Sequence, residues 1–174
     1  MLRDDDLDGF LRLKHSALSS DPLSFVASLD EDPRDYRERV RARLSHASLA
    51  AGDVIVGAFA PELIGIAAVT RDSHLKRSHK AELHGMYVRP EFRGRGLGRT
   101  ILSEVLRLAW QMPGLEEIQL IVATHNREAA SLYRQAGFRE VWTESRALRV
   151  EGRYVDAHHM VLSVSTSDCR SVSG

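Results

Sequence analysis

The chain has 174 residues, a length typical of one domain with a single core. Lys plus Arg and Asp plus Glu each number 24, so we expect neither nucleic acid nor a membrane surface as a partner, and any affinity for phosphate must be local. The single cysteine, Cys169, excludes an internal disulfide and a cysteine metal cluster, and it points to a cytoplasmic location. We expect no secretory leader and no membrane span, because no segment is apolar enough.

Two helices are expected near the start of the chain. In residues 8–18 apolar side chains recur at roughly helical spacing. A second helix is predicted to begin at Pro33, with Asp32 as its N-cap. The acidic run at 30–32 could attract a cationic amine, although capping and solvation explain most of it.

The rest of the chain alternates between strand and helix patterns, which predicts an α/β protein. The expected strands lie at 52–60, 62–70, 80–88, 116–124, 139–150 and 153–164, and the expected helices at 97–112 and 126–136. Residues 1–163 are expected to form one domain. The polar tail at 164–174 has nothing to bury and is expected to be disordered.

Glycines and arginines are concentrated in the turn between the strand that ends at Val88 and the helix that begins at Leu97. The glycines are Gly94, Gly96 and Gly98, and the arginines are Arg93, Arg95 and Arg99. Glycine permits a positive φ and close approach of a ligand, and the first N–H groups of a helix have no internal acceptor. Guanidinium groups add positive charge and paired donors. The turn therefore predicts a site for a phosphorylated ligand.

The spacing of the glycines excludes two common phosphate motifs. The dinucleotide fingerprint would need a glycine where Arg99 stands, and a P-loop would need a lysine after the glycines. A structural glycine turn with solvated arginines remains the alternative.

Two blocks resemble the GNAT superfamily of N-acetyltransferases. Residues 93–98, RGRGLG, match the R/Q-x-x-G-x-G/A signature after an apolar strand, and residues 126–138 resemble the N-x-x-A-x-x-L-Y-x-x-x-G-F segment. The resemblance extends over about residues 53–163. It implies an α+β fold with a mixed, mostly antiparallel, twisted central sheet that is flanked by helices and splayed at its two central strands.

One departure from the family concerns its first strand, which normally precedes the first helix. Here only Met1, Leu2 and Arg3 stand before the first acidic residues, so either that strand is very short or the chain begins late. A weakened edge strand could favour pairing with a second subunit, which leaves a homodimer open.

The resemblance also implies where acetyl-CoA would bind. The backbone N–H groups from Arg93 to Gly98 would hold the pyrophosphate, and the pantetheine arm would pair with the strand near Met86 and Val88. Asn126 would contact the pantetheine or hold the loop, and a plain N-cap is a compatible interpretation. The expected cofactor-binding residues are Met86, Val88, Arg93, Gly94, Arg95, Gly96, Leu97, Gly98, Asn126 and Tyr133. No metal site is expected, and the adjacent His158 and His159 are interpreted as structural.

Acetyl transfer to an amine requires a proton acceptor, because an alkylammonium with a pKa around 10 must become neutral before it attacks. Glu82 is the preferred candidate for this acceptor, and His84 is the second choice. The two share a face of the strand at 80–88 with Met86 only if no bulge forms near Gly85. The leaving thiolate benefits from a proton donor. Tyr133 matches the position at which many family members carry this general acid, and a tyrosine packed on the core is the alternative.

These residues together predict an enzyme that transfers the acetyl group of acetyl-CoA to a primary amine of a small molecule or protein. Direct attack in a ternary complex is expected, because no cysteine lies near the motifs. The first alternative is a non-catalytic acyl-CoA-binding module, against which Tyr133 argues. The second is a nucleic-acid-binding domain with a basic loop, against which the zero net charge argues.

Overall fold

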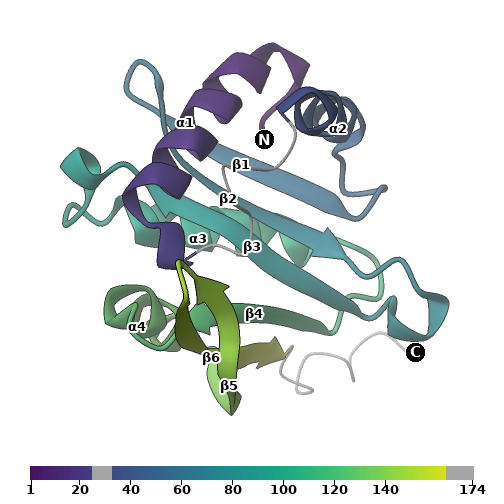
Figure 1. Ribbon diagram of the computed structural model, residues 1–174. Coiled ribbons are helices and arrows are strands. Elements are labelled where there is room, and N and C mark those ends of the chain that lie inside the picture. Colours follow the sequence, from purple (N-terminus) through teal and green to yellow (C-terminus); the bar gives the residue numbers. More distant parts are fainter. Residues whose placement is uncertain (25–32, 164–174) are drawn as a thin grey trace, which may run out of the picture.

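The computed structural model describes residues 1–24 and 33–163, which form a six-stranded sheet with helices on both faces (Figure 1). The helices are α1 (Leu7–Ser20), α2 (Pro33–His46), α3 (Leu97–Ala109) and α4 (Arg127–Gln135), with short 3₁₀ turns η1 (Asp4–Asp6), η2 (Pro22–Ser24), η3 (Leu75–Arg77) and η4 (Pro90–Phe92). The strands are β1 (Asp53–Phe59), β2 (Leu63–Arg71), β3 (Lys80–Val88), β4 (Glu117–Ala123), β5 (Arg139–Val150) and β6 (Arg153–Ser163). The acidic run at 30–32, with the predicted cap Asp32, and the tail from residue 164 lie outside the described residues.

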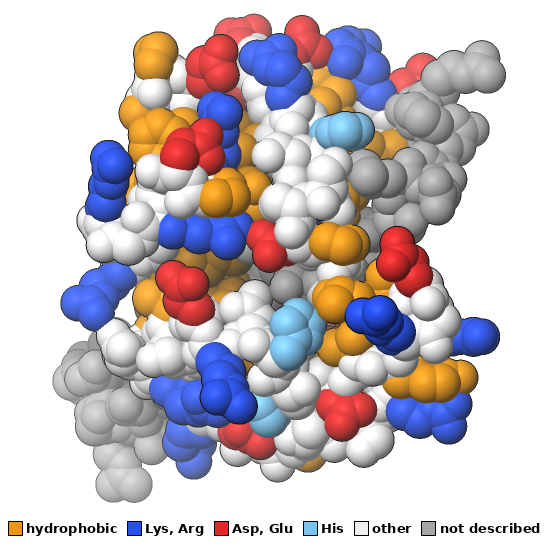
Figure 2. All heavy atoms as spheres, turned by 60° about the vertical axis from the view of Figure 1, so that its left-hand side comes forward, with side chains coloured by type: hydrophobic (Ala, Val, Ile, Leu, Met, Phe, Trp, Pro, Cys, Tyr) orange, Lys and Arg blue, Asp and Glu red, His pale blue; other side chains and the backbone are white. Residues whose placement is uncertain are grey.

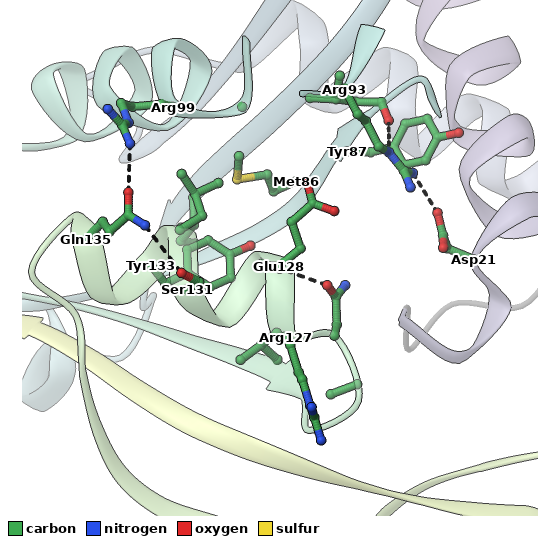
Figure 3. A pocket seen from close by; sticks show the side chains of 18 of the residues that line it. Asp21, Met86, Tyr87, Arg93, Arg99, Arg127, Glu128, Ser131, Tyr133 and Gln135 are labelled. Atoms are coloured by element: carbon green, nitrogen blue, oxygen red, sulfur yellow. Dashed lines mark hydrogen bonds and ion pairs between the residues drawn. The ribbon is translucent and has the colours of Figure 1, made fainter. Parts of the chain in front are cut away.

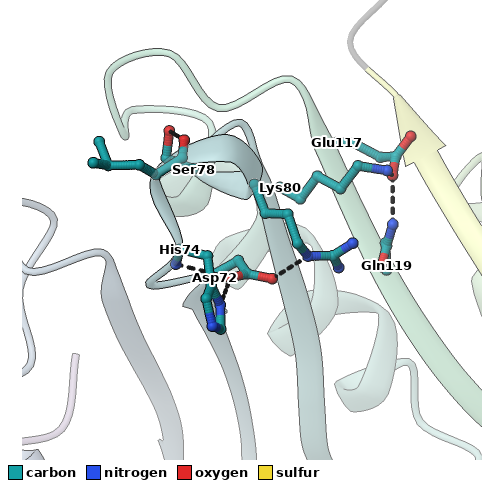
Figure 4. Close-up of polar contacts among 8 residues, drawn as sticks. Asp72, His74, Ser78, Lys80, Glu117 and Gln119 are labelled. Atoms are coloured by element: carbon teal, nitrogen blue, oxygen red, sulfur yellow. Dashed lines mark hydrogen bonds and ion pairs between the residues drawn. The ribbon is translucent and has the colours of Figure 1, made fainter.

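The strand order is β1-β2-β3-β4-β6-β5, and each neighbouring pair is antiparallel except the parallel pair β3 and β4. This arrangement confirms the predicted mixed, mostly antiparallel sheet. The parallel pairing is short and runs only from Lys80 beside Glu117 to Glu82 beside Gln119. A 2.6 Å ion pair between Lys80 and Glu117 fastens this end (Figure 4). Beyond it the two central strands separate, as the predicted splay requires.

Two apolar layers cover the two faces of the sheet. The amphipathic pattern that predicted α3 is confirmed: Ile101, Leu102 and Val105 are buried against the face that also carries Leu83 of β3. On the other face α1 and α2 pack on residues from β1, β2 and β3. These two helices therefore leave the same face of β4, β6 and β5 uncovered. None of the described helices has the length and hydropathy needed to cross a membrane.

A bulge interrupts the alternation of β3. Ala68 of β2 pairs with His84 but Ile66 pairs with Tyr87, and Gly85 between them has φ 63°. Glycine adopts this left-handed conformation at little cost. As a result Glu82 and His84 face the α1 and α2 side, whereas the side chain of Met86 packs with the α3 layer. The expectation that all three share a face holds only for Glu82 and His84.

The segment before α1 makes one strand-like contact with the sheet. The backbone N–H of Leu2 donates to the carbonyl of Ile55 on β1 at 2.8 Å, and the Leu2 side chain is buried. It fills the space above Gly57, where an added Cβ would lie 2.4 Å from Leu2 Cδ2. A single hydrogen bond and one buried side chain thus occupy the place of the expected first strand.

Candidate active site

The glycine turn forms an open nest of backbone donors at the start of α3. Gly94 (φ 74°) and Gly96 (φ 80°) are left-handed, and Gly96 is the N-cap of α3 without a side-chain cap. Among the described residues, none accepts a hydrogen bond from the backbone N–H groups of Gly94 through Arg99. A Cβ built on Gly94 or Gly96 would meet no atom within 4 Å. Unpaired amides, a helix N-terminus and free space are the features that bind phosphate.

The arginines of the turn differ in their contacts. Arg93 donates to the Asp21 carboxylate at 2.7 Å and to the Val88 carbonyl at 2.9 Å, so it ties the turn to the end of α1 (Figure 3). Arg99 donates to Gln135 of α4 at 2.7 Å, and Arg95 is exposed. On the face that Figure 2 shows, Lys and Arg side chains are interspersed with Asp and Glu.

A cleft of about 930 Å³, hereafter the donor cleft, runs from this turn into the gap between β3 and β4. From Leu83 to Val88 no residue of β3 pairs with a described residue of β4. Apart from the Val88 carbonyl, which accepts from Arg93, the polar groups of the β3 backbone on this side can pair with an extended ligand. The donor cleft brings together most of the predicted cofactor-binding residues: Met86, Val88, Arg93, Gly94, Gly96, Leu97, Gly98, Asn126 and Tyr133. Arg95 is not part of its lining.

Two predicted residues lie on α4. The Asn126 carbonyl oxygen accepts a hydrogen bond from the backbone N–H of Ala129 at 3.1 Å, so the N-cap interpretation is confirmed. The ring of Tyr133 is buried and contacts Phe138 edge-on, while its hydroxyl is directed into the cleft (Figure 3). Burial raises the pKa of Tyr133 to about 12. The phenol is therefore protonated at neutral pH and can donate a hydrogen bond.

His84 belongs to a polar network on the α1 and α2 side of the sheet. The Asp53 carboxylate accepts two hydrogen bonds of 2.7 Å from Arg43 and one of 2.9 Å from the Thr70 hydroxyl. Burial raises the pKa of Asp53, but the hydrogen bonds and charge of Arg43 outweigh it and hold that pKa below its usual value. The carboxylate is thus ionised and can only accept hydrogen bonds.

The side chains around His84 keep its ring neutral. Its Nε2 lies 2.9 Å from Thr70 Oγ1 and 3.2 Å from a terminal nitrogen of Arg43, which can only donate hydrogen bonds. Burial and the charge of Arg43 lower the pKa of His84 to about 4, which keeps the imidazole neutral at pH 7. The ring is therefore much less basic than a free imidazole.

Glu82 lies outside the donor cleft, in a second cavity of about 300 Å³ that we call the hairpin cavity. It lies between the paired end of β3 and β4 and the β5–β6 hairpin, and its lining residues are Glu82, Gln119, Leu120, Ile121, Val141, Trp142, His159, Met160 and Val161. Ile121 lines both cavities, so the two meet at the splay. Sequence analysis did not identify Gln119, Ile121 or Trp142 as site residues. In the sequence Ile121 and Trp142 were apolar residues on predicted strands. Only the structure shows that they are half-exposed and so mark a binding surface.

The two adjacent histidines of β6 have separate partners. His158 contacts Thr143 at 2.8 Å and Glu140 at 3.0 Å, and His159 contacts Glu144 at 2.8 Å. Both thus cross-link the hairpin, in keeping with the structural role predicted for them.

The chain belongs to the GNAT family of acetyltransferases, whose sequence pattern it matches over residues 15–138. It is 29% identical over 100 residues to spermidine N(1)-acetyltransferase of Vibrio cholerae, covering 58% of this chain and 56% of that protein. It is 38% identical over 100 residues to the N-alpha-acetyltransferase RimI of Mycobacterium tuberculosis, covering 56% of this chain and 58% of that protein. The chain spans about half the length of these curated relatives.

The fold is also that of solved acetyltransferase structures. A structure of yncA, a putative acetyltransferase from Salmonella typhimurium with its cofactor acetyl-CoA, superposes with a TM-score of 0.78. The superposition covers 95% of this chain and 92% of that chain at 19% identity. At this identity the likeness concerns the fold, and the site residues of the present chain must be argued from their own geometry.

Proposed function

We propose that this protein transfers the acetyl group of acetyl-CoA to a primary amine by direct attack. The observation that carries the proposal is the row of unpaired amides from Gly94 to Arg99 at the mouth of a cleft that opens between two splayed strands. The amides and the helix N-terminus suit a pyrophosphate, and the unpaired edge of β3 suits the pantetheine amides. The thioester would then lie at the splay, between the donor cleft and the hairpin cavity.

In the reaction the amine nitrogen forms a bond to the thioester carbonyl carbon, the C–S bond breaks, and an N-acetylated amine and the free thiol of CoA result. Glu82 is proposed to take a proton from the nitrogen, which becomes acidic as its lone pair is committed to carbon. An unpaired N–H on the β4 side of β3, near Met86, would stabilise the oxyanion. Tyr133 would donate its proton or a strong hydrogen bond to the departing sulfur.

The positions of Glu82 and Tyr133 support a catalytic role over simple binding. Tyr133 opens into the donor cleft and Glu82 into the hairpin cavity, so a donor and an acceptor of protons stand on opposite sides of the splay. A module that only senses acyl-CoA would need the donor cleft alone. We further propose that the amine belongs to a small molecule or a protein and that the enzyme works in the cytoplasm.

Calorimetric titration with acetyl-CoA, with CoA, NAD and ATP as controls, tests the proposal. Binding of only the two CoA species at micromolar concentration is expected, followed by release of the CoA thiol when amines are added. Binding without thiol release across a broad amine panel would favour the sensing module. Absence of acetyl-CoA binding would overturn the proposal.

A further inference from the structure

The floor of the hairpin cavity is built from side chains that line up across neighbouring strands. The strand register gives two rows: Glu82, Gln119, Val161 and Arg139, then Ile121, His159 and Trp142. Arg139 ends the first row but is not among the residues that line the cavity. Both rows are on the sheet face opposite α3. On this face α1 and α2 pack on β1 to β3, and the turn η2 contacts β4 and β5. Among the described residues, Glu82, Ile121 and Trp142 of the floor remain exposed.

An aromatic platform forms the hairpin end of the floor. Trp142 is 52% exposed and stacks on the His159 ring at a centroid distance of 4.1 Å and an interplanar angle of 19°. His159 is itself held by Glu144 at 2.8 Å. The indole is therefore held in place by His159. Together with the half-exposed Ile121 of the same row, it offers an apolar surface to a flat group.

The opposite end of the floor accepts hydrogen bonds and positive charge. Glu82 is exposed, and its carboxylate makes no hydrogen bond or ion pair with any described residue. The Gln119 amide nitrogen donates to Glu117 at 2.6 Å, which leaves its carbonyl oxygen as an acceptor. No lysine or arginine is among the described residues that line the cavity.

We propose that the hairpin cavity binds the acceptor, and that this acceptor is a primary monoamine with a flat apolar body and no acidic group, such as an arylalkylamine. The inference rests on the proposed function. The ammonium group lies at Glu82, beside the splay where the thioester is expected, and the apolar body lies on Ile121 and Trp142. Glu82 attracts the cation and, when the amine attacks in its neutral form, takes the proton that the nitrogen releases as the C–N bond forms.

The composition of the cavity argues against two other kinds of amine. An α-amino acid would bring its carboxylate next to Glu82, where like charges repel. A polyamine would bring a second cation to the Trp142 end, where no described carboxylate lines the cavity and Glu144 is already paired with His159. The volume of about 300 Å³ is at the lower end of the range for ligand pockets, about 300–1,000 Å³, which suits a small molecule.

A matched set of acceptors tests the inference: 2-phenylethylamine, phenylalanine and spermidine, compared by thiol release at saturating acetyl-CoA. Phenylethylamine and phenylalanine differ only by the carboxylate. We expect kcat/KM for phenylethylamine to exceed that of either other amine at least roughly tenfold. Trp142→Ala should raise its KM about tenfold while kcat and acetyl-CoA affinity are kept, since it removes the platform alone. Tyr154→Ala, at an exposed aromatic of the same hairpin outside the cavity, is the control.

A direct binding measurement complements the kinetics. In the Trp110→Phe variant Trp142 is the remaining tryptophan, and its emission should change when phenylethylamine is added to the CoA complex. A preference for phenylalanine or spermidine, or an unchanged KM in Trp142→Ala, would overturn the inference while acetyl transfer still stands. Failure to bind acetyl-CoA would instead overturn the proposed function itself.

Discussion

The donor cleft and the hairpin cavity meet at Ile121 but are built from different parts of the chain. At the mouth of the donor cleft the groups proposed to bind the donor are backbone amides from one continuous turn, Gly94 to Arg99. In the hairpin cavity the groups proposed to bind the acceptor are side chains from four strands, among them Glu82 and Trp142. A backbone nest suits a ligand that stays the same, whereas a surface of side chains can be altered one residue at a time. On the proposed function, the acceptor could therefore change by substitution while the donor site is kept.

The largest expected effect tests whether the backbone turn of the donor cleft binds acetyl-CoA. Gly96→Leu should reduce acetyl-CoA binding by at least roughly 100-fold, because the side chain would occupy the space of the pyrophosphate. The change also strains a residue at φ 80°, by about 1–2 kcal/mol. Gly114→Leu is the matched control, since Gly114 has φ 70°, open space around its Cβ and no place in either cavity. Calorimetry should show normal binding only in the control, and equal losses would assign the effect to strain.

The next effect concerns the chemistry at the junction of the two cavities. Tyr133→Phe should lower kcat by about 10²–10³, because the donor to the sulfur is lost, and leave acetyl-CoA affinity nearly unchanged. The fold should persist, since the ring keeps its contact with Phe138. Steady-state rates, with Tyr154→Phe as control, measure this. Wild-type turnover in Tyr133→Phe across a wide pH range would remove Tyr133 from the mechanism.

A third prediction tests the buried network behind the splay. The pKa of His84 is lowered from 6.5 to about 4, so between these pH values the unfolded chain binds a proton that the folded chain does not bind. The free energy of unfolding is therefore highest above about pH 6.5 and falls by about 3 kcal/mol toward pH 4. His84→Gln, which removes the titratable ring and keeps a polar side chain, should flatten this decline in urea titrations. His74→Gln, at a mostly exposed histidine, should leave it intact. A wild-type slope in His84→Gln would contradict the assignment.

The smallest expected effect sharpens the claim that backbone, not side-chain charge, recognises the phosphates. Arg95→Ala should weaken acetyl-CoA binding only roughly two- to fivefold, since an exposed charge near a helix N-terminus contributes about 0.3–1 kcal/mol. Arg107→Ala, in the last turn of α3 and paired with Glu104, should have no effect. A loss at Arg95 as large as that at Gly96 would mean that side-chain charge dominates.

Most elements of the fold could be predicted from the sequence because each carries a local period. The spacing of Ile101 and Val105 indicated α3, and Asn126 was correctly identified as the cap of α4. No periodic pattern in the sequence predicted the bulge at Gly85, because its position depends on how β3 pairs with β2. Because of this bulge, Met86 lies on the opposite face of β3 from Glu82 and His84.

The candidate site shows the same division. The sequence by itself indicated the backbone nest, because Gly94, Gly96 and the amides between them are contiguous and glycine permits the positive φ that both residues adopt. Only the tertiary structure placed Tyr133 and Glu82 on opposite sides of the splay and brought Trp142 to within reach of Glu82's cavity. Those residues are far apart in the chain, and strand order and register, which depend on long-range pairing, bring them together.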